Sequence, residues 1–205
     1  MSHNHWQEMF NSLEYKNYCD IVNQHFAVCK NKTVLEIGAF GGWHSKLILD
    51  QQPMDLTVVD PNIMVNDIIN KNNIKDIVVD DVFNYLKINR KFDVVVCCGV
   101  LYHLHSPLYL LELISNMSNP DYIILDSYNL TGFGCNEEID NNLGCRYTMN
   151  SWKSCKLNIG LPNIVFEMAM TNLGYKEIRK DALSFPNILS GSKRNSWMGL
   201  WEKVK

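Results

Sequence analysis

Two hydrophobic patterns alternate along the chain between residues 33 and 128. Short runs of apolar and β-branched residues have the length and composition of strands buried on both faces. These runs span residues 33–38, 56–60, 76–81, 92–100 and 121–128. Between them, apolar residues recur at steps of three and four, as in amphipathic helices. These stretches span residues 41–52, 61–73, 82–89 and 106–118. The alternation predicts an open parallel sheet with helices on both faces.

The two ends of the chain extend this pattern. Residues 6–28 carry apolar residues mainly at steps of three and four, including Leu13 and Tyr18, and predict an amphipathic helix. A further helix is expected at 161–175, and two strand-like segments follow it in succession. These segments span residues 175–185 and 195–204. The expected fold is α/β: a Rossmann-like, doubly wound, mostly parallel sheet with a C-terminal antiparallel hairpin at its edge.

The pattern is interrupted at residues 129–160, which are rich in Asn, Gly and Ser and show no clear period. A segment of this length without an element of its own is uncommon in a compact domain and is often a functional lid. We expect one domain over residues 1–205. Its parts would be a helical arm at 1–32, a cofactor-binding core at 33–128, a lid at 129–160 and a closing helix and hairpin at 161–205.

Composition narrows the class of protein. The 205 residues carry a formal net charge of -3, with a pI near 6.0. This excludes the global basic surface of a dedicated nucleic-acid-binding protein, but not an enzyme with one local basic patch. No apolar run has membrane-spanning length, and the first ten residues lack the features of a signal peptide, so a cytoplasmic protein is expected. The seven cysteines, odd in number and without a Cys-x-x-Cys pair, predict free thiols.

The ends of the first three predicted strands carry the features of a cofactor site. Ligands of open α/β sheets bind beyond the carboxyl ends of the strands. The first strand runs into a glycine-rich loop, where Gly38 allows a sharp turn and Gly41 and Gly42 keep side chains away from a ligand. Asp60 closes the second strand at the spacing from which an acid reaches ribose hydroxyls, and another acid closes the third. In register, these features indicate a site for a ribose-containing cofactor.

Four stretches make the chain resemble the class I S-adenosylmethionine-dependent methyltransferases: VLEIGAFGG, TVVD, VVDD and KFDVVVCCGVLYHLHSP. The last stretch resembles the corresponding motif in the branch of this family that includes tRNA wobble-uridine carboxymethyltransferases. The resemblance covers residues 33–127 and implies the class I methyltransferase fold, methyltransferase activity and S-adenosylmethionine as cofactor. The family loop usually has a glycine where this chain has Phe40, so the Phe40 ring must point away from the methionine part of the cofactor or pack on it.

The resemblance implies a role for each cofactor-site residue. Glu36 and the backbone of Gly38 would hold the methionine amino group. Asp60 would accept hydrogen bonds from both ribose hydroxyls, unless it only stabilises the N-terminus of the following helix. Asp81 would bind the adenine amino group, with Asp80 as its competitor. The amide of Val82 would donate to a ring nitrogen of adenine, and the backbone of Gly99 would pass close to the methionine part. The other residues expected to bind the cofactor are Ala39, Phe40 and Gly42 of the glycine-rich loop.

Three residues are candidates for catalysis. Methyl transfer from a sulfonium needs orientation, a dry site and in some cases a base. His103, just past the fourth strand, is the best-placed base because imidazole titrates near neutral pH, although it could instead order its loop. His44 is a weaker candidate for which a structural role is favoured, and Tyr102 would either wall the cofactor pocket or pack. No metal site is expected.

The predicted lid brings basic and aromatic residues together, at Arg146, Tyr147, Trp152, Lys153 and Lys156. Such a mixture suits base stacking with phosphate contact, but it also occurs on ordinary surface loops. We expect the acceptor to be a small metabolite or an RNA, with the small metabolite favoured and a protein substrate left open. The alternatives are carboxymethyl transfer from a carboxylated donor to a tRNA base, a non-catalytic binding protein with a blocked cofactor site, and a dinucleotide-dependent reductase, which the fourth motif disfavours.

Overall fold

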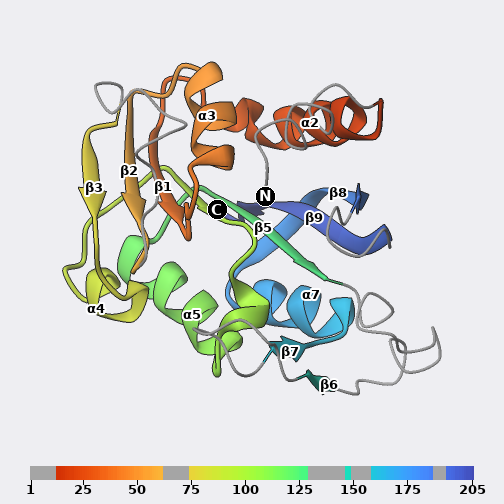
Figure 1. Cartoon of the computed structure of the whole chain (residues 1–205). Helices are drawn as coiled ribbons and strands as arrows, with labels where there is room; N and C mark the ends of the chain where they lie inside the picture. Colours follow the sequence, from red (N-terminus) through yellow and green to blue (C-terminus); the bar gives the residue numbers. More distant parts are fainter. Residues whose placement is uncertain (1–12, 62–73, 129–145, 149–157, 187–192) are drawn as a thin grey trace.

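The chain folds around one seven-stranded mixed sheet (Figure 1). The computed structural model describes residues 13–61, 74–128, 146–148, 158–186 and 193–205. In spatial order the strands are β3 (Asp76–Val78), β2 (Asp55–Val59), β1 (Thr33–Ile37), β4 (Val94–Cys97), β5 (Tyr122–Tyr128), β9 (Lys193–Lys203) and β8 (Tyr175–Pro186). Strands β3 to β5 in this order are parallel, and β9 is antiparallel to both of its neighbours. The predicted fold class, including the edge hairpin, is confirmed.

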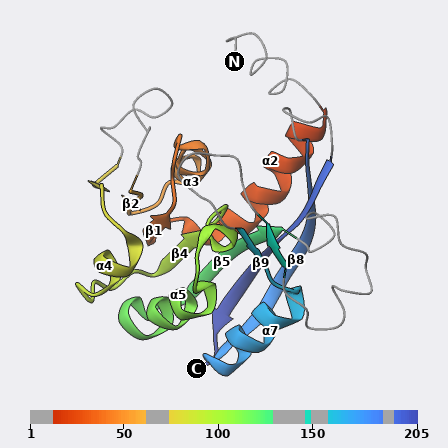
Figure 2. The ribbon, with the colours of Figure 1, turned by 60° about the horizontal axis from the view of Figure 1, so that its bottom comes forward.

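Helices cover both faces of the sheet, as Figures 1 and 2 show from two directions. One face carries α2 (Leu13–Phe26) and α3 (Trp43–Asp50); the other carries α4 (Val82–Leu86), α5 (Pro107–Leu113) and α7 (Asn163–Asn172). Each face has its own apolar core. Successive residues of a strand contribute to opposite cores: Val34 packs on the α2 and α3 side, whereas Leu35 packs on the α5 side.

Helix α2 is buried along a face that differs in part from the predicted one. Tyr15, Tyr18, Val22 and Phe26 are buried in the core, at steps of three and four. Leu13 was assigned to the apolar stripe, but it is 70% exposed. The reason is geometric: Leu13 precedes Tyr15 by two positions, which places it about 200° away around the helix. A short 3-10 helix, η1 (Ala27–Cys29), continues the segment beyond α2, and residues 6–12 lie outside the described part of the chain.

Some element boundaries also differ from the expectation. The predicted helix at 106–118 is α5 followed by the π-helical turn η5 (Ile114–Ser118), with Ser106 at the N-cap position and Pro107 as the first residue. Strand β4 ends at Cys97 rather than at residue 100. Gly99, with φ +75°, turns the backbone out of the extended conformation soon after that point.

The predicted lid contains two short strands that its sequence does not reveal. Strands β6 (Arg146–Thr148) and β7 (Asn158–Gly160) pair antiparallel in a separate two-stranded sheet. The expectation of a segment without its own elements was therefore wrong in this detail, because strands of three residues are too short to show a period. The rest of 129–160, like the predicted helix at 62–73, lies outside the described residues.

Two general expectations can be compared with the described residues. Their four cysteines, Cys19, Cys29, Cys97 and Cys98, are free thiols, as predicted. No helix in the described part of the chain is long and apolar enough to cross a membrane.

Candidate functional site

The carboxyl ends of the parallel strands are in register. Ile37 of β1 pairs with Val59 of β2 and Cys97 of β4, and Cys97 pairs with Leu125 of β5. The residues that follow these positions therefore form one row at the edge of the sheet: Gly38, Asp60, Cys98 and Asp126. Open α/β sheets bind ligands at this edge. The register thus brings together Gly38 and Asp60, two residues predicted to bind a cofactor.

The loop after β1 depends on glycine at two positions. Gly38 has φ +80°, and its amide donates a hydrogen bond to the carbonyl of Val59 at 2.8 Å. A Cβ atom at Gly38 would come within 2.1 Å of Cγ2 of Val100, so no side chain fits there. Gly42 has φ +77° and caps the N-terminus of α3. Both positions favour glycine because L side chains rarely adopt positive φ.

Phe40 replaces the expected glycine without filling the site with its ring. It has φ +44°, and the residue is 57% exposed. Its amide donates a hydrogen bond to Oδ2 of Asp60 at 2.9 Å. The neighbouring Ala39 is buried at 6% exposure and packs in the core on the α2 and α3 side. The loop therefore meets the site with its backbone, while the Phe40 side chain faces solvent.

Glu36 is a buried acid, and only one of its two carboxylate oxygens accepts a hydrogen bond among the described residues. The residue is 2% exposed, and the hydroxyl of Ser45 on α3 donates a hydrogen bond to its Oε2. Within the described residues, its Oε1 has no hydrogen-bond partner. Burial, together with the charge of Asp60, raises the pKa of Glu36 to about 7, although the Ser45 hydrogen bond opposes this. A cationic group beside Oε1 would satisfy this oxygen and favour the ionised form.

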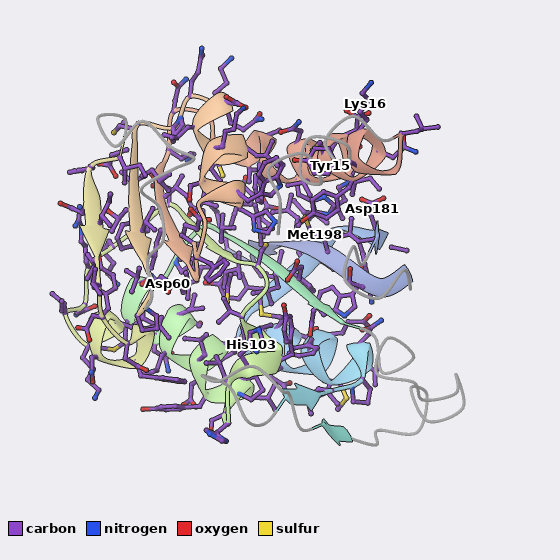
Figure 3. All side chains as sticks on the ribbon, in the orientation of Figure 1. Tyr15, Lys16, Asp60, His103, Asp181 and Met198 are labelled. Atoms are coloured by element: carbon purple, nitrogen blue, oxygen red, sulfur yellow. The ribbon has the colours of Figure 1, made fainter. Side chains whose placement is uncertain are left out.

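Asp60 lies at the end of β2, at the position labelled in Figure 3. It is 7% exposed, and its own amide donates to the carbonyl of Val78 at 3.1 Å, which ties the end of β2 to β3. The carboxylate is thus held at the junction of the glycine loop and the third strand.

The two acids that follow β3, Asp80 and Asp81, accept hydrogen bonds from nearby backbone amides. Asp81 is exposed, and its Oδ1 accepts a hydrogen bond from the amide of Phe83 at 2.8 Å, which caps α4. Oδ1 of Asp80 accepts from the amide of Asp81 at 2.7 Å. Val82, whose amide was predicted to contact adenine, is the first residue of α4. Both acids lie at the same strand end, so the predicted competition between them remains open.

Asp126, in β5 just past the part that pairs with β4, is a candidate site residue that the sequence analysis did not name. Its Oδ1 accepts a hydrogen bond from the amide of Gly99, the residue predicted to pass close to the methionine part of a cofactor. Burial raises the pKa of Asp126 to about 6, against the effect of this hydrogen bond. The signal was present, because YIILD at 122–126 ends an apolar run in an acid, as TVVD does at Asp60.

The predicted catalytic residues Tyr102 and His103 belong to the short 3-10 helix η4 (Leu101–His103), just past β4. Their ring centroids lie 4.2 Å apart, and His103, labelled in Figure 3, is exposed. A Cβ atom at Gly99 would lie 3.7 Å from the hydroxyl of Tyr102, so this hydroxyl is close to the row of strand ends. Strand β7 of the predicted lid contacts η4.

His44 is held between α3 and α2. The hydroxyl of Tyr18 lies 2.8 Å from Nε2 of His44, within hydrogen-bond distance. The ring of Phe26 meets the imidazole edge to face, with centroids 5.9 Å apart. Burial lowers the pKa of His44 to about 4, so the ring is neutral near pH 7. These contacts support the structural role that the sequence analysis favoured for His44.

The basic and aromatic residues of the predicted lid cannot be assigned to the site. Trp152, Lys153 and Lys156 lie outside the described residues, and Arg146 and Tyr147 are described only as part of the β6 backbone.

Comparisons with known proteins agree with this architecture. A sequence profile of the family described as "Methyltransferase domain" matches residues 7–155. The crystal structure of a Burkholderia thailandensis 1,6-didemethyltoxoflavin-N1-methyltransferase, with bound 1,6-didemethyltoxoflavin and S-adenosylhomocysteine, superposes with a TM-score of 0.67. That match has 13% identity and covers 99% of this chain and 84% of that one. At this identity the likeness establishes the fold.

Curated relatives are similar over part of their length. A tRNA U34 carboxymethyltransferase from Nautilia profundicola is 30% identical over 134 residues, which cover 61% of this chain and 44% of the relative. One of the same name from Campylobacter fetus is 31% identical over 112 residues, covering 50% of this chain and 38% of the relative. The match therefore spans less than half the length of these curated relatives.

Proposed function

The chain belongs to the methyltransferase-domain family, and on this premise we propose that it transfers a methyl group from S-adenosylmethionine to an acceptor molecule. The carboxyl edge of the sheet supports this proposal, because the row from Gly38 to Asp126 combines a glycine loop with one acid directly after β2 and another in β5 just past its pairing with β4. This arrangement suits a ligand with a positively charged end and a ribose.

The observation that carries the proposal is the unsatisfied oxygen of Glu36. A buried carboxylate oxygen without a partner is costly, and a hydrogen bond from an ammonium group removes that cost. Oε1 of Glu36 is such an oxygen among the described residues, and it lies two positions before the turn at Gly38. The methionine ammonium of S-adenosylmethionine fits this requirement.

The other cofactor contacts follow from the same edge. Asp60 would receive the ribose hydroxyls on the carboxylate that the Phe40 amide already orients. Asp81 and the amide of Val82 would meet the adenine ring at the start of α4. The backbone of Gly99 would face the methionine chain. Phe40, with its ring exposed, would contribute through its backbone and leave the site open.

The cofactor supplies an activated methyl group when bound, so the protein's task is orientation and exclusion of water. Tyr102 and His103 border the row of strand ends and would face the acceptor. His44, locked against Tyr18 and neutral near pH 7, would hold α2 against α3 and so close this side of the site.

The acceptor is proposed to be a small molecule, with RNA as the competing class. Carboxymethyl transfer from a carboxylated donor to a tRNA base is a second candidate function, because the curated relatives described above carry the name tRNA U34 carboxymethyltransferase. Titration of the wild-type protein with S-adenosylmethionine and with its carboxylated analogue separates the two candidates, since the tighter ligand identifies the donor.

Isothermal titration calorimetry of S-adenosylmethionine with wild type and Glu36→Gln tests the proposal. Wild type should bind, and Glu36→Gln should bind at least tenfold more weakly, the scale of a lost charge-assisted hydrogen bond. Glu112→Gln, an exposed acid on α5, is the matched control and should bind as wild type does. Failure of wild type to bind either donor would leave a non-catalytic role, and unchanged binding by Glu36→Gln would refute the assigned site.

A further inference from the structure

Asp126 lies within β5, one residue past the last position of this strand that pairs with β4. Leu125 pairs with Cys97 and Cys97 with Ile37, so Asp126 continues the row that contains Gly38 and Asp60. No role was predicted for it. Its place in the row nevertheless puts a carboxylate beside the part of the edge where Gly99 would contact the donor.

The hydrogen bonds of Asp126 leave half of its carboxylate available. Oδ1 accepts from the amide of Gly99, which fixes the side chain against the loop after β4. Among the described residues, no other hydrogen bond to its carboxylate occurs, and the residue is partly exposed. The second oxygen can therefore face a ligand.

The side chain of Asp126 lies on the same face of the sheet as Glu36. Ile124 packs in the core on the α2 and α3 side and Leu125 in the opposite core. Because side chains alternate along a strand, the side chain of Asp126 lies on the α2 and α3 side again. By the same alternation Glu36 shares a face with Val34. The two acids thus approach the carboxyl edge from one side, on strands separated only by β4.

The surroundings of Asp126 do not neutralise its charge. Its charge raises the pKa values of Tyr18 in α2, of Cys97 at the end of β4 and of Cys98 directly after it, and its paired residue on β9 is Met198. Among the described residues, no lysine or arginine forms an ion pair with it. A partly buried carboxylate without a cation favours a cationic ligand.

We propose that Asp126 is a specificity-determining residue that recognises the charge of the methyl donor, with its carboxylate facing the sulfonium. The sulfonium is the positive charge that S-adenosylmethionine has and the product S-adenosylhomocysteine lacks. Asp126 therefore strengthens donor binding relative to product binding and helps the product to leave after transfer. This inference rests on the proposed function.

Calorimetric titration of both compounds with wild type and Asp126→Asn tests it. The ratio of the two dissociation constants isolates the sulfonium, because both compounds carry the ammonium, ribose and adenine. Asp126→Asn should shift this ratio toward S-adenosylhomocysteine by roughly tenfold, the order expected for one partly screened charge pair. In wild type the ratio should shift the same way from about pH 8 to about pH 5, as Asp126 takes up a proton, and in Asp126→Asn the shift should be smaller.

Two further variants keep the result interpretable. Asp126→Glu keeps the charge and should keep the preference of wild type. Asp121→Asn removes an exposed acid directly before the first residue of β5, and it should leave the ratio of the two dissociation constants unchanged. If wild type binds both compounds and the ratio is the same in Asp126→Asn, the inference is wrong while the proposed function stands. If wild type binds neither compound, the proposed function itself fails.

Discussion

The amide of Phe40 donates a hydrogen bond to Oδ2 of Asp60 at 2.9 Å, across two neighbouring strand ends. This bond joins the loop after β1 to the end of β2. It uses one oxygen of the acid to support the backbone on which a cofactor would lie, and it orients the carboxylate toward that same ligand. Loop shape and ligand binding therefore depend on one side chain.

Substitution of Asp60 should separate these two tasks. Asp60→Ala removes both and should weaken S-adenosylmethionine binding by about 1–3 kcal/mol, the cost of lost charge-assisted hydrogen bonds. Asp60→Asn keeps an oxygen that can accept from the Phe40 amide but loses the charge, so its binding should fall between Asp60→Ala and wild type. Calorimetry measures both variants. Binding of Asp60→Ala at wild-type strength would contradict the assignment.

Phe40 should prove dispensable for binding and costly for stability. Its φ of +44° is unfavourable for a residue with a Cβ, and its side chain is exposed. Phe40→Gly should therefore raise the free energy of unfolding by up to about 1 kcal/mol and keep S-adenosylmethionine binding. Phe40→Ala removes the ring but keeps the strain, so it is the control that should show no such gain in urea denaturation. A loss of binding in both variants would mean that the ring contacts the cofactor.

The positions that follow from chain geometry were predictable from the sequence. Apolar runs of strand length locate the strands, and in a parallel sheet their carboxyl ends meet at one edge. The neighbourhood of Gly38 and Asp60 follows from that rule alone. The preference for glycine at Gly38 is also local, because a turn directly after a buried strand needs positive φ.

What the sequence could not show depends on tertiary contacts. The contact between Tyr18 and His44 joins residues 26 positions apart, and no periodic pattern in the sequence indicates that they meet. Asp126 became a candidate only when the register placed it beside Gly99, although an acid after an apolar run was visible. Leu13 matched an apolar spacing, yet it lies outside the buried arc that Tyr15 begins.

Gly38 and Gly174 form a matched pair for testing the loop. Their φ angles are +80° and +83°, but a Cβ at Gly38 would overlap Val100, whereas one at Gly174 meets nothing within 4 Å. Gly174→Ala should cost about 1 kcal/mol for backbone strain alone. Gly38→Ala should cost about 3 kcal/mol because overpacking is added, and Gly38→Ala with Val100→Ala should regain part of that difference. Urea denaturation measures all three, and equal costs at the two glycines would contradict the close contact.

Glu36 should make the stability of the ligand-free protein depend on pH. Its pKa is raised from 4.5 to about 7 by burial, so the folded chain binds this proton more tightly than the unfolded chain does. Between these two values the folded state carries more protons, and the free energy of unfolding therefore falls as pH rises through the window. Above about pH 7 the full cost of the buried charge is present.

Glu36→Gln removes that cost. The substitution should therefore stabilise the ligand-free protein but weaken its binding of S-adenosylmethionine. In the absence of ligand at about pH 8, the variant should be more stable than wild type by roughly 1–3 kcal/mol, and the difference should vanish at about pH 4. A bound ammonium pairs with the carboxylate and lowers its pKa, so S-adenosylmethionine binding to wild type should strengthen from about pH 6 to about pH 8, while binding to Glu36→Gln stays weak. Denaturant titrations with and without ligand measure both effects. Equal stability of the two proteins at about pH 8 would contradict the unsatisfied charge at Glu36 and show that other groups already compensate it in the free chain.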